Sequence, residues 1–179
     1  MQDSLSVRSS YANKLTFICL ALLGCGLMTV CSLIKVPFYP VPFTLQTFAI
    51  FFLVLTQSPK QAFASAICYL FCGTIGLPVF CSHANQYWMF GKCGGYLVAF
   101  PIAAYLTSKL AEQWPQVVAI LFGQSVVYLL GFIWLIPFFG ESVAFTQGVV
   151  FFIPSDLLKI LMAISLASCW NKWRNSWVQ

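Results

Sequence analysis

The chain alternates long apolar runs with short polar or proline-rich breaks. An apolar helix of about 20 residues crosses the roughly 30 Å hydrocarbon core of a bilayer. The pattern therefore predicts an all-α integral membrane protein with six transmembrane helices. The runs that carry this prediction lie at 15–34, 43–55, 61–75, 94–108, 117–139 and 147–169, with a turn expected at 140–146.

The second run, 43–55, is too short for a full crossing. It follows the segment 35–42, which contains three prolines. Proline lacks the amide hydrogen that a helix needs and disfavours helical geometry in the residue before it. We therefore expect this segment to be broken or partly re-entrant. Non-helical backbone at membrane depth survives only inside protein or beside a cavity.

Composition and charge agree with a membrane location and give a topology. The chain is 60% hydrophobic and 7% charged with mean hydropathy +0.87, against about 25% charged in soluble domains. With six spans, the cationic residues outside the spans divide six to two, which places both termini in the cytoplasm. We expect tails at 1–14 and 170–179 around one domain, 15–169. The six are Arg8, Lys14, Lys60, Lys109, Lys172 and Arg174; the two are Lys35 and Lys92.

Few residues could support catalysis, a metal or nucleic-acid binding. The chain has only four acidic residues and one histidine, and its eight cysteines form no Cys-x-x-Cys pair. Paired carboxylates, clustered metal ligands and a phosphate-binding loop are all missing from the sequence. It also has no run of basic residues that could follow a phosphate backbone. We therefore expect no enzyme activity, no metal, no cofactor and no nucleic-acid partner.

Asp156 and Lys159 are the most informative residues, because they lie inside the apolar run from Gly148 to Ala167. Three positions apart on a helix, their side chains share one face. Charges at membrane depth cost at least about 2.5–3.5 kcal/mol each and usually face a protein interior or a cavity. The pair is either a structural salt bridge or part of a ligand site. Pro154 and Ser155 indicate a helix start there, whose amide groups favour an anion.

Other polar and small residues form weaker candidates. Ala21, Gly24 and Cys25 make a small-residue face on the first helix, suited either to internal packing or to docking another membrane subunit. Polar groups beside apolar runs are costly unless they bind something, and aromatic side chains can cover a flat ligand. The residues selected on these grounds are Thr44, Gln46, Tyr87, Trp88, Phe90 and Tyr96.

Four motifs together resemble the BioY family, the biotin-specific S components of energy-coupling factor (ECF) vitamin transporters. They are Val41-Pro-Phe-Thr-Leu-Gln-Thr47, Gly73-Thr-Ile-Gly-Leu-Pro-Val-Phe80, Gly91-Lys-Cys-Gly-Gly-Tyr-Leu97 and Ile153-Pro-Ser-Asp-Leu-Leu-Lys159. The resemblance implies the six-helix S-component fold with an outward-facing biotin pocket in a bacterial plasma membrane. It also implies a transmembrane T subunit and two ABC-type ATPases as partners.

The resemblance assigns the family's aspartate and lysine to Asp156 and Lys159. A carboxylate can accept an N–H of the ureido ring of biotin, while a lysine can pair with the valerate carboxylate or donate to the ureido carbonyl. The resemblance also makes Lys92 a second candidate for the valerate and Asn85 or Gln86 a candidate to complete ureido recognition, with Tyr87, Trp88 and Phe90 covering the rings. Lys92 and Cys93 replace a Pro-Thr usual in the family, and Ser155 replaces a glycine. An S component for another vitamin and a membrane assembly subunit without a ligand remain the alternatives.

Overall fold

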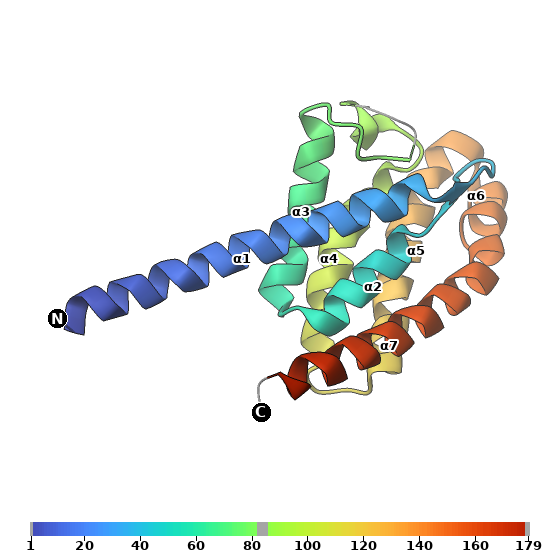
Figure 1. The fold of residues 1–179 in the computed structure, drawn as a ribbon. Coiled ribbons are helices and arrows are strands. Elements are labelled where there is room, and N and C mark those ends of the chain that lie inside the picture. Colours follow the sequence, from blue (N-terminus) through green and yellow to red (C-terminus); the bar gives the residue numbers. More distant parts are fainter. Residues whose placement is uncertain (1, 82–85, 178–179) are drawn as a thin grey trace.

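The computed structural model is almost entirely helical and describes residues 2–81 and 86–177, with side chains described from residue 13 (Figure 1). Within these residues a bundle of helices surrounds a cavity near one end. The elements are α1 (Gln2–Leu33), β1 (Lys35–Val36), β2 (Phe43–Thr44), α2 (Gln46–Thr56), α3 (Pro59–Thr74), the 3-10 helix η1 (Trp88–Phe90), α4 (Gly94–Leu110), α5 (Gln116–Phe139), α6 (Glu141–Gly148), the 3-10 helix η2 (Val150–Phe152) and α7 (Ile153–Ser176).

The helices fit an all-α membrane protein, as predicted. Three helical stretches are long and apolar enough to cross a membrane, at 13–33, 116–139 and 141–176. Helices α3 and α4 have 16 and 17 residues and therefore extend about 24–26 Å. Helix α2 has 11 residues and extends only about 16 Å, well short of the hydrocarbon core.

The helix of the first span begins far earlier than its apolar run. Helix α1 is continuous from Gln2, so the expected N-terminal tail is helical over the described residues 2–14, and this end projects away from the bundle (Figure 1). The C-terminal tail is also helical through residue 176, because α7 continues to Ser176.

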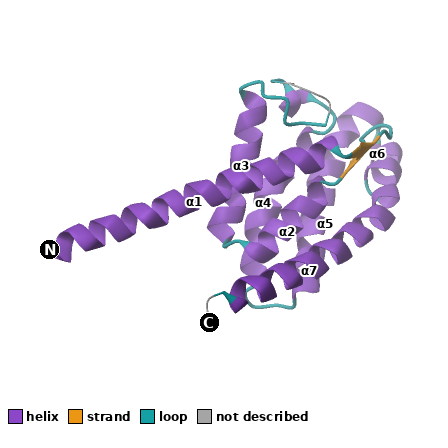
Figure 2. Cartoon of the chain, in the orientation of Figure 1, coloured by secondary structure: helices purple, strands orange, loops and turns teal. Residues whose placement is uncertain are grey.

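The proline-rich segment is not helical, as predicted, and it forms a small antiparallel hairpin that the sequence did not predict. Lys35 pairs with Thr44 and Val36 with Phe43, and the two strands lie at the end of α1 (Figure 2). The prolines occupy the loop between the strands, where no helical hydrogen bond is needed. The short helix α2 starts directly after this hairpin, so its first turn faces the cavity.

The predicted last span was wrong at its beginning. Residues 141–148 form helix α6 where a turn was expected, and residues 150–152 form η2, so 147–169 is not one helix. Helix α7 starts at Ile153, with Pro154 in its first turn. A proline is well tolerated there because the first amide groups of a helix have no intrahelical acceptor. The helix start that Pro154 and Ser155 indicated is confirmed.

The small-residue face of α1 packs inside the chain. Ala21, Gly24 and Cys25 are buried, and a Cβ added to Gly24 would collide with the Ser65 hydroxyl on α3. Glycine therefore lets the backbones of α1 and α3 approach closely at this level. These contacts favour the internal-packing alternative, and docking of another membrane subunit on Ala21, Gly24 and Cys25 stays a prediction.

Helices α4 and α5 are in close contact beside the cavity. A Cβ at Gly131 on α5 would occupy the position of the Tyr96 ring, so the missing side chain provides the space for this ring. Tyr96 then donates its hydroxyl to the carbonyl oxygen of Gly148, 2.7 Å away. This contact ties α4 to the end of α6, which fixes the segment that leads into α7.

Helices α2 and α7 are joined at both ends. Near the cavity, the Thr47 hydroxyl lies 3.2 Å from Asp156 Oδ1. At the opposite end, Asn171 donates to the carbonyl of Leu55 at 3.1 Å, and Arg174 donates to the carbonyl of Thr56 at 3.2 Å. The final carbonyl groups of α2, which have no intrahelical donor, thus receive theirs from α7.

Candidate functional site

A cavity of about 290 Å³ lies between the hairpin, α2, α4, α5 and the first turn of α7. Its size is close to the lower limit of small-molecule pockets, about 300 Å³. Most of its wall is apolar, and the polar groups gather on one side. Seven of the residues predicted from the sequence line the cavity: Thr44, Gln46, Trp88, Lys92, Tyr96, Asp156 and Lys159.

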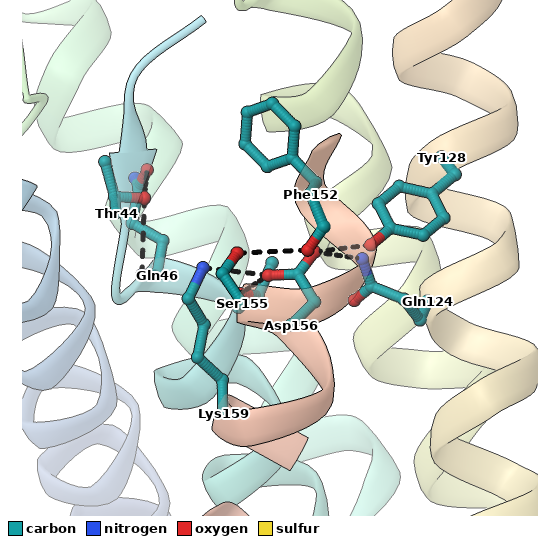
Figure 3. Close-up of polar contacts among 9 residues, drawn as sticks. Thr44, Gln46, Gln124, Tyr128, Phe152, Ser155, Asp156 and Lys159 are labelled. Atoms are coloured by element: carbon teal, nitrogen blue, oxygen red, sulfur yellow. Dashed lines mark hydrogen bonds and ion pairs between the residues drawn. The ribbon is translucent and has the colours of Figure 1, made fainter. Parts of the chain in front are cut away.

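The Asp156 carboxylate is the centre of the polar side (Figure 3). Its Oδ1 lies 2.8 Å from Lys159 Nζ and 3.2 Å from the Thr47 hydroxyl. Its Oδ2 accepts from Gln124 Nε2 at 2.7 Å and from the Tyr128 hydroxyl at 2.8 Å. Both members of the ion pair are buried, Asp156 at 2% exposure and Lys159 at 7%. The pair is therefore formed inside the protein and also lines the cavity.

The local sequence explains why a carboxylate is tolerated here. Asp156 lies in the first turn of α7, where the amide dipoles stabilise negative charge. Four hydrogen-bond donors replace the water molecules that the carboxylate loses on burial. An isolated buried charge would have no such donors. The donors come from α2, α5 and α7, so one side chain connects three helices.

Thr44 and Gln46 form a second polar group on the hairpin side of the cavity (Figure 3). Thr44 donates to Gln46 Oε1 at 2.9 Å, and Gln46 Nε2 lies 2.5 Å from the Tyr69 hydroxyl. Tyr69 in turn donates to the carbonyl of Val79 at 3.0 Å. This chain of bonds holds the loop after α3 against the hairpin, so both residues shape the wall.

Aromatic side chains form the wall on the side of the 75–93 loop. Trp88 is buried, its indole nitrogen donates to the Thr74 hydroxyl at 3.1 Å, and its ring lies 5.6 Å from the Phe80 ring. Cys93 lines the same cavity. Burial raises the pKa of the Cys93 thiol to about 12, which keeps it protonated near neutral pH.

A second lysine lines the cavity. Lys92 is half-buried, and its Nζ sits 4.7 Å from the centre of the Tyr39 ring. Tyr39 also packs edge-on against Phe139 at 5.5 Å. The hairpin loop and the segment before α4 therefore meet through a cation–π contact.

Three residues selected from the loop do not contribute to the wall. Gln86 is exposed, and Tyr87 and Phe90 are 74% and 75% exposed. Successive residues of a 3-10 helix point about 120° apart. Turning Trp88 of η1 inward therefore turns Phe90 outward. Asn85, the fourth residue selected there, lies outside the described residues.

Sequence reasoning missed the contribution of α5. Gln124 and Tyr128 bind Asp156 directly, yet the run 117–139 was interpreted only as a span. A signal was available: the two polar residues are four positions apart in an apolar helix, which places them on one face. Phe100, Val127 and Phe152 complete the apolar wall.

Three cysteines converge elsewhere in the fold. The sulfur atoms of Cys25, Cys68 and Cys72 all lie within 4.8 Å of one another. Their sequence spacing gave no indication of this, because Cys25 comes from α1 and the other two from α3. They are not part of the cavity wall, and zinc prefers four ligands in structural sites. The cavity itself presents lysines, a paired carboxylate, amides and hydroxyls, which suits an organic ligand.

Comparison with known proteins agrees with this architecture. "Probable biotin transporter BioY" of Rickettsia prowazekii is 34% identical over 143 residues, 76% of this chain and 74% of that protein. The protein of the same description from Pyrococcus horikoshii is 36% identical over 143 residues, 79% of this chain and 88% of the relative. The "Biotin transporter BioY" of Thermotoga maritima is 31% identical over 150 residues.

A solved structure shares the fold. The crystal structure of the S-component for biotin from an ECF-type ABC transporter superposes with a TM-score of 0.78, at 22% identity, over 90% of this chain and 93% of that one. The S-component fold predicted from the sequence is thus confirmed. The BioY family model matches residues 1–176. With this match over nearly its whole length, the chain belongs to the BioY family.

Proposed function

We propose that this chain is the biotin-binding S component of an ECF transporter, acting in uptake and not in catalysis. The observation that carries the proposal is the cavity: one polar side around Asp156 and Lys159, apolar and aromatic walls, and a second lysine, Lys92, in its lining. The descriptions of the relatives and of the structural neighbour as biotin proteins support it.

Biotin has the chemistry that such a cavity can bind. Its ureido head offers two N–H donors and a carbonyl acceptor, and its thioether ring and valerate chain are apolar up to the terminal carboxylate. In our proposal the head lies on the polar side, where Asp156 and Lys159 stand. The rings lie between Trp88, Tyr96 and Phe152, and the carboxylate turns to Lys92, whose charge would strengthen that bond.

We also propose the assembly and the orientation. Lys35 and Lys92 lie at the cavity end of the molecule, where Lys35 donates to the carbonyl of Cys81 and Lys92 contacts Tyr39. The other cationic residues outside the predicted spans lie in the N-terminal part of α1, in the first turn of α3, in the last turn of α4 and near the C-terminal end of α7. This division favours cytoplasmic termini and an outward-facing cavity in a bacterial plasma membrane. A T subunit and two ABC-type ATPases would then drive reorientation of the chain.

Retention of labelled biotin by the purified chain in detergent tests the proposal. Stoichiometric retention that excess unlabelled biotin displaces would support it. Thiamine and riboflavin serve as competitors that should fail, and desthiobiotin, which keeps the ureido ring, should compete. A folded protein that retains another vitamin and not biotin would replace biotin with that vitamin. A folded protein that retains none would favour the assembly-subunit alternative.

A further inference from the structure

The hydrogen-bonding capacity of Asp156 is already used within the protein. A carboxylate offers about four lone-pair positions, two on each oxygen. Lys159 and Thr47 occupy those of Oδ1, and Gln124 and Tyr128 occupy those of Oδ2. A ligand N–H could reach this carboxylate only by displacing one of these donors. The acceptor for such a donor must therefore be sought next to Asp156.

Gln124 supplies an acceptor with the right properties. Its residue is 4% exposed, and its Oε1 is one of the four buried side-chain oxygens without a hydrogen-bond partner in the part of the chain that the structure describes. The other three belong to Thr107, Gln147 and Asn171, which are not part of the cavity wall, whereas Gln124 is. An unpaired buried acceptor is costly, and a ligand N–H would remove this cost.

The orientation of the Gln124 amide is fixed by its neighbour. Nε2 lies 2.7 Å from Asp156 Oδ2, and the reversed amide would set oxygen against a carboxylate oxygen that accepts only. Asp156 therefore holds Oε1 as a permanent acceptor. On the other oxygen of Asp156, Lys159 keeps ammonium hydrogens beyond the one that it donates to Oδ1.

We propose that Gln124 Oε1 accepts an N–H of the ligand and that Asp156 is the positioning residue that aims both Gln124 and Lys159. Gln124 Oε1 is an acceptor and the Lys159 ammonium is a donor, and they lie on the two sides of the Asp156 carboxylate. Together they match the edge of a cyclic urea, where an N–H lies beside the carbonyl. This inference rests on the proposed function. It adds that the site recognises the ligand by an N–H of its head group. A site built to bind an N–H rejects an analogue without it, because its acceptor is left unpaired.

Cyclic carbamate analogues of biotin test this without a steric change, since each replaces one ring N–H with oxygen and keeps the carbonyl. Both regioisomers should be measured in competition with labelled biotin on the detergent-solubilised chain. We expect one regioisomer to bind wild type at least about 30-fold more weakly than biotin. In Gln124→Met, biotin should weaken by a similar factor and the difference between biotin and that carbamate should vanish.

Two further variants separate direct contact from an effect through Asp156. Tyr128→Phe removes another donor from the same Oδ2 and leaves Gln124 Oε1 in place, so it should keep the discrimination against the carbamate. Ser125→Ala, exposed on the next position of α5, should match wild type throughout.

The outcomes distinguish the inference from the proposed function. Unchanged discrimination in Gln124→Met overturns the inference and leaves biotin binding intact. So does equal binding of biotin and both carbamates by wild type, which needs no variant to fold. Loss of discrimination in Tyr128→Phe as well would make Gln124 one of several residues acting through Asp156. A folded wild type that retains no biotin overturns the proposed function and this inference with it.

Discussion

Lys159 Nζ lies 2.8 Å from Asp156 Oδ1, one helical turn along α7, and both side chains are buried in the wall of one cavity. The two interpretations of this pair, a salt bridge and a ligand site, are therefore compatible in one geometry. Replacing one member leaves a buried charge without its partner, whereas replacing both removes the charge altogether. This difference separates the two roles experimentally.

For Asp156→Asn alone we expect a loss of about 3–5 kcal/mol in the free energy of unfolding, because the buried Lys159 ammonium loses its counter-charge. The double variant Asp156→Asn/Lys159→Met should recover most of this stability and still bind biotin at least about 10-fold more weakly than wild type. Thermal unfolding in detergent and biotin titration measure the two effects. Full biotin affinity in the double variant would reduce the pair to a structural bridge.

Lys92 should act on the acid end of the ligand. Lys92→Ala is expected to weaken biotin by about 10- to 100-fold, the range of a charge-assisted hydrogen bond, and to leave biotinamide nearly unchanged. Lys35→Ala is the matched control, since Lys35 is a cation at the same end of the molecule that does not line the cavity. An equal loss for biotin and biotinamide in Lys92→Ala would assign Lys92 to the shape of the cavity wall instead.

Gly131 should tolerate no side chain. The Cβ of Gly131→Ala would displace the Tyr96 ring and strain its bond to Gly148, which we expect to cost about 1–3 kcal/mol of stability. Gly26→Ala is the control, because nothing lies within 4 Å of its added Cβ. Unfolding midpoints of the two variants in detergent make the comparison. Equal midpoints would mean that α4 and α5 can separate at little cost.

Cys93 should react slowly with maleimide at neutral pH. The thiolate is the reactive form, and burial raises the Cys93 pKa from 9.0 to about 12, so deprotonation and labelling should increase only as the pH rises well above 9. The same thiol in the SDS-denatured chain is the reference, and mass spectrometry of its peptide follows the labelling. Bound biotin should slow the labelling of Cys93 in the folded chain further. Rapid labelling of Cys93 at pH 7 would contradict the burial of this thiol.

What the sequence could predict was local or strongly patterned. Pro154 marks the start of α7, the proline-rich segment precedes a short α2, and charges as rare as Asp156 and Lys159 identify the site. Contacts between distant segments were not accessible in this way. The packing of Gly24 against Ser65 depends on which helices are neighbours, and an apolar run does not encode this information.

The candidate site shows the same division. Tyr87, Trp88 and Phe90 were selected together because all three are aromatic. In the structure only Trp88 is buried, because the geometry of η1 points the three side chains in different directions. The role of Gln124 depends on the position of Asp156 across the bundle. Two polar residues four apart on α5 indicate a face, although only the folded chain shows which group that face meets.

The double attachment of α2 to α7 has a mechanical consequence. Sliding one helix along the other would break Thr47–Asp156 at the cavity or the bonds of Asn171 and Arg174 at the far end. We therefore expect α2 and α7 to move together as one rigid body, by rotation and not by sliding past each other. A small shift of Asp156 on ligand entry would then appear as a tilt at the opposite end of α7, where Asn171 and Arg174 lie 15 and 18 residues further along the chain.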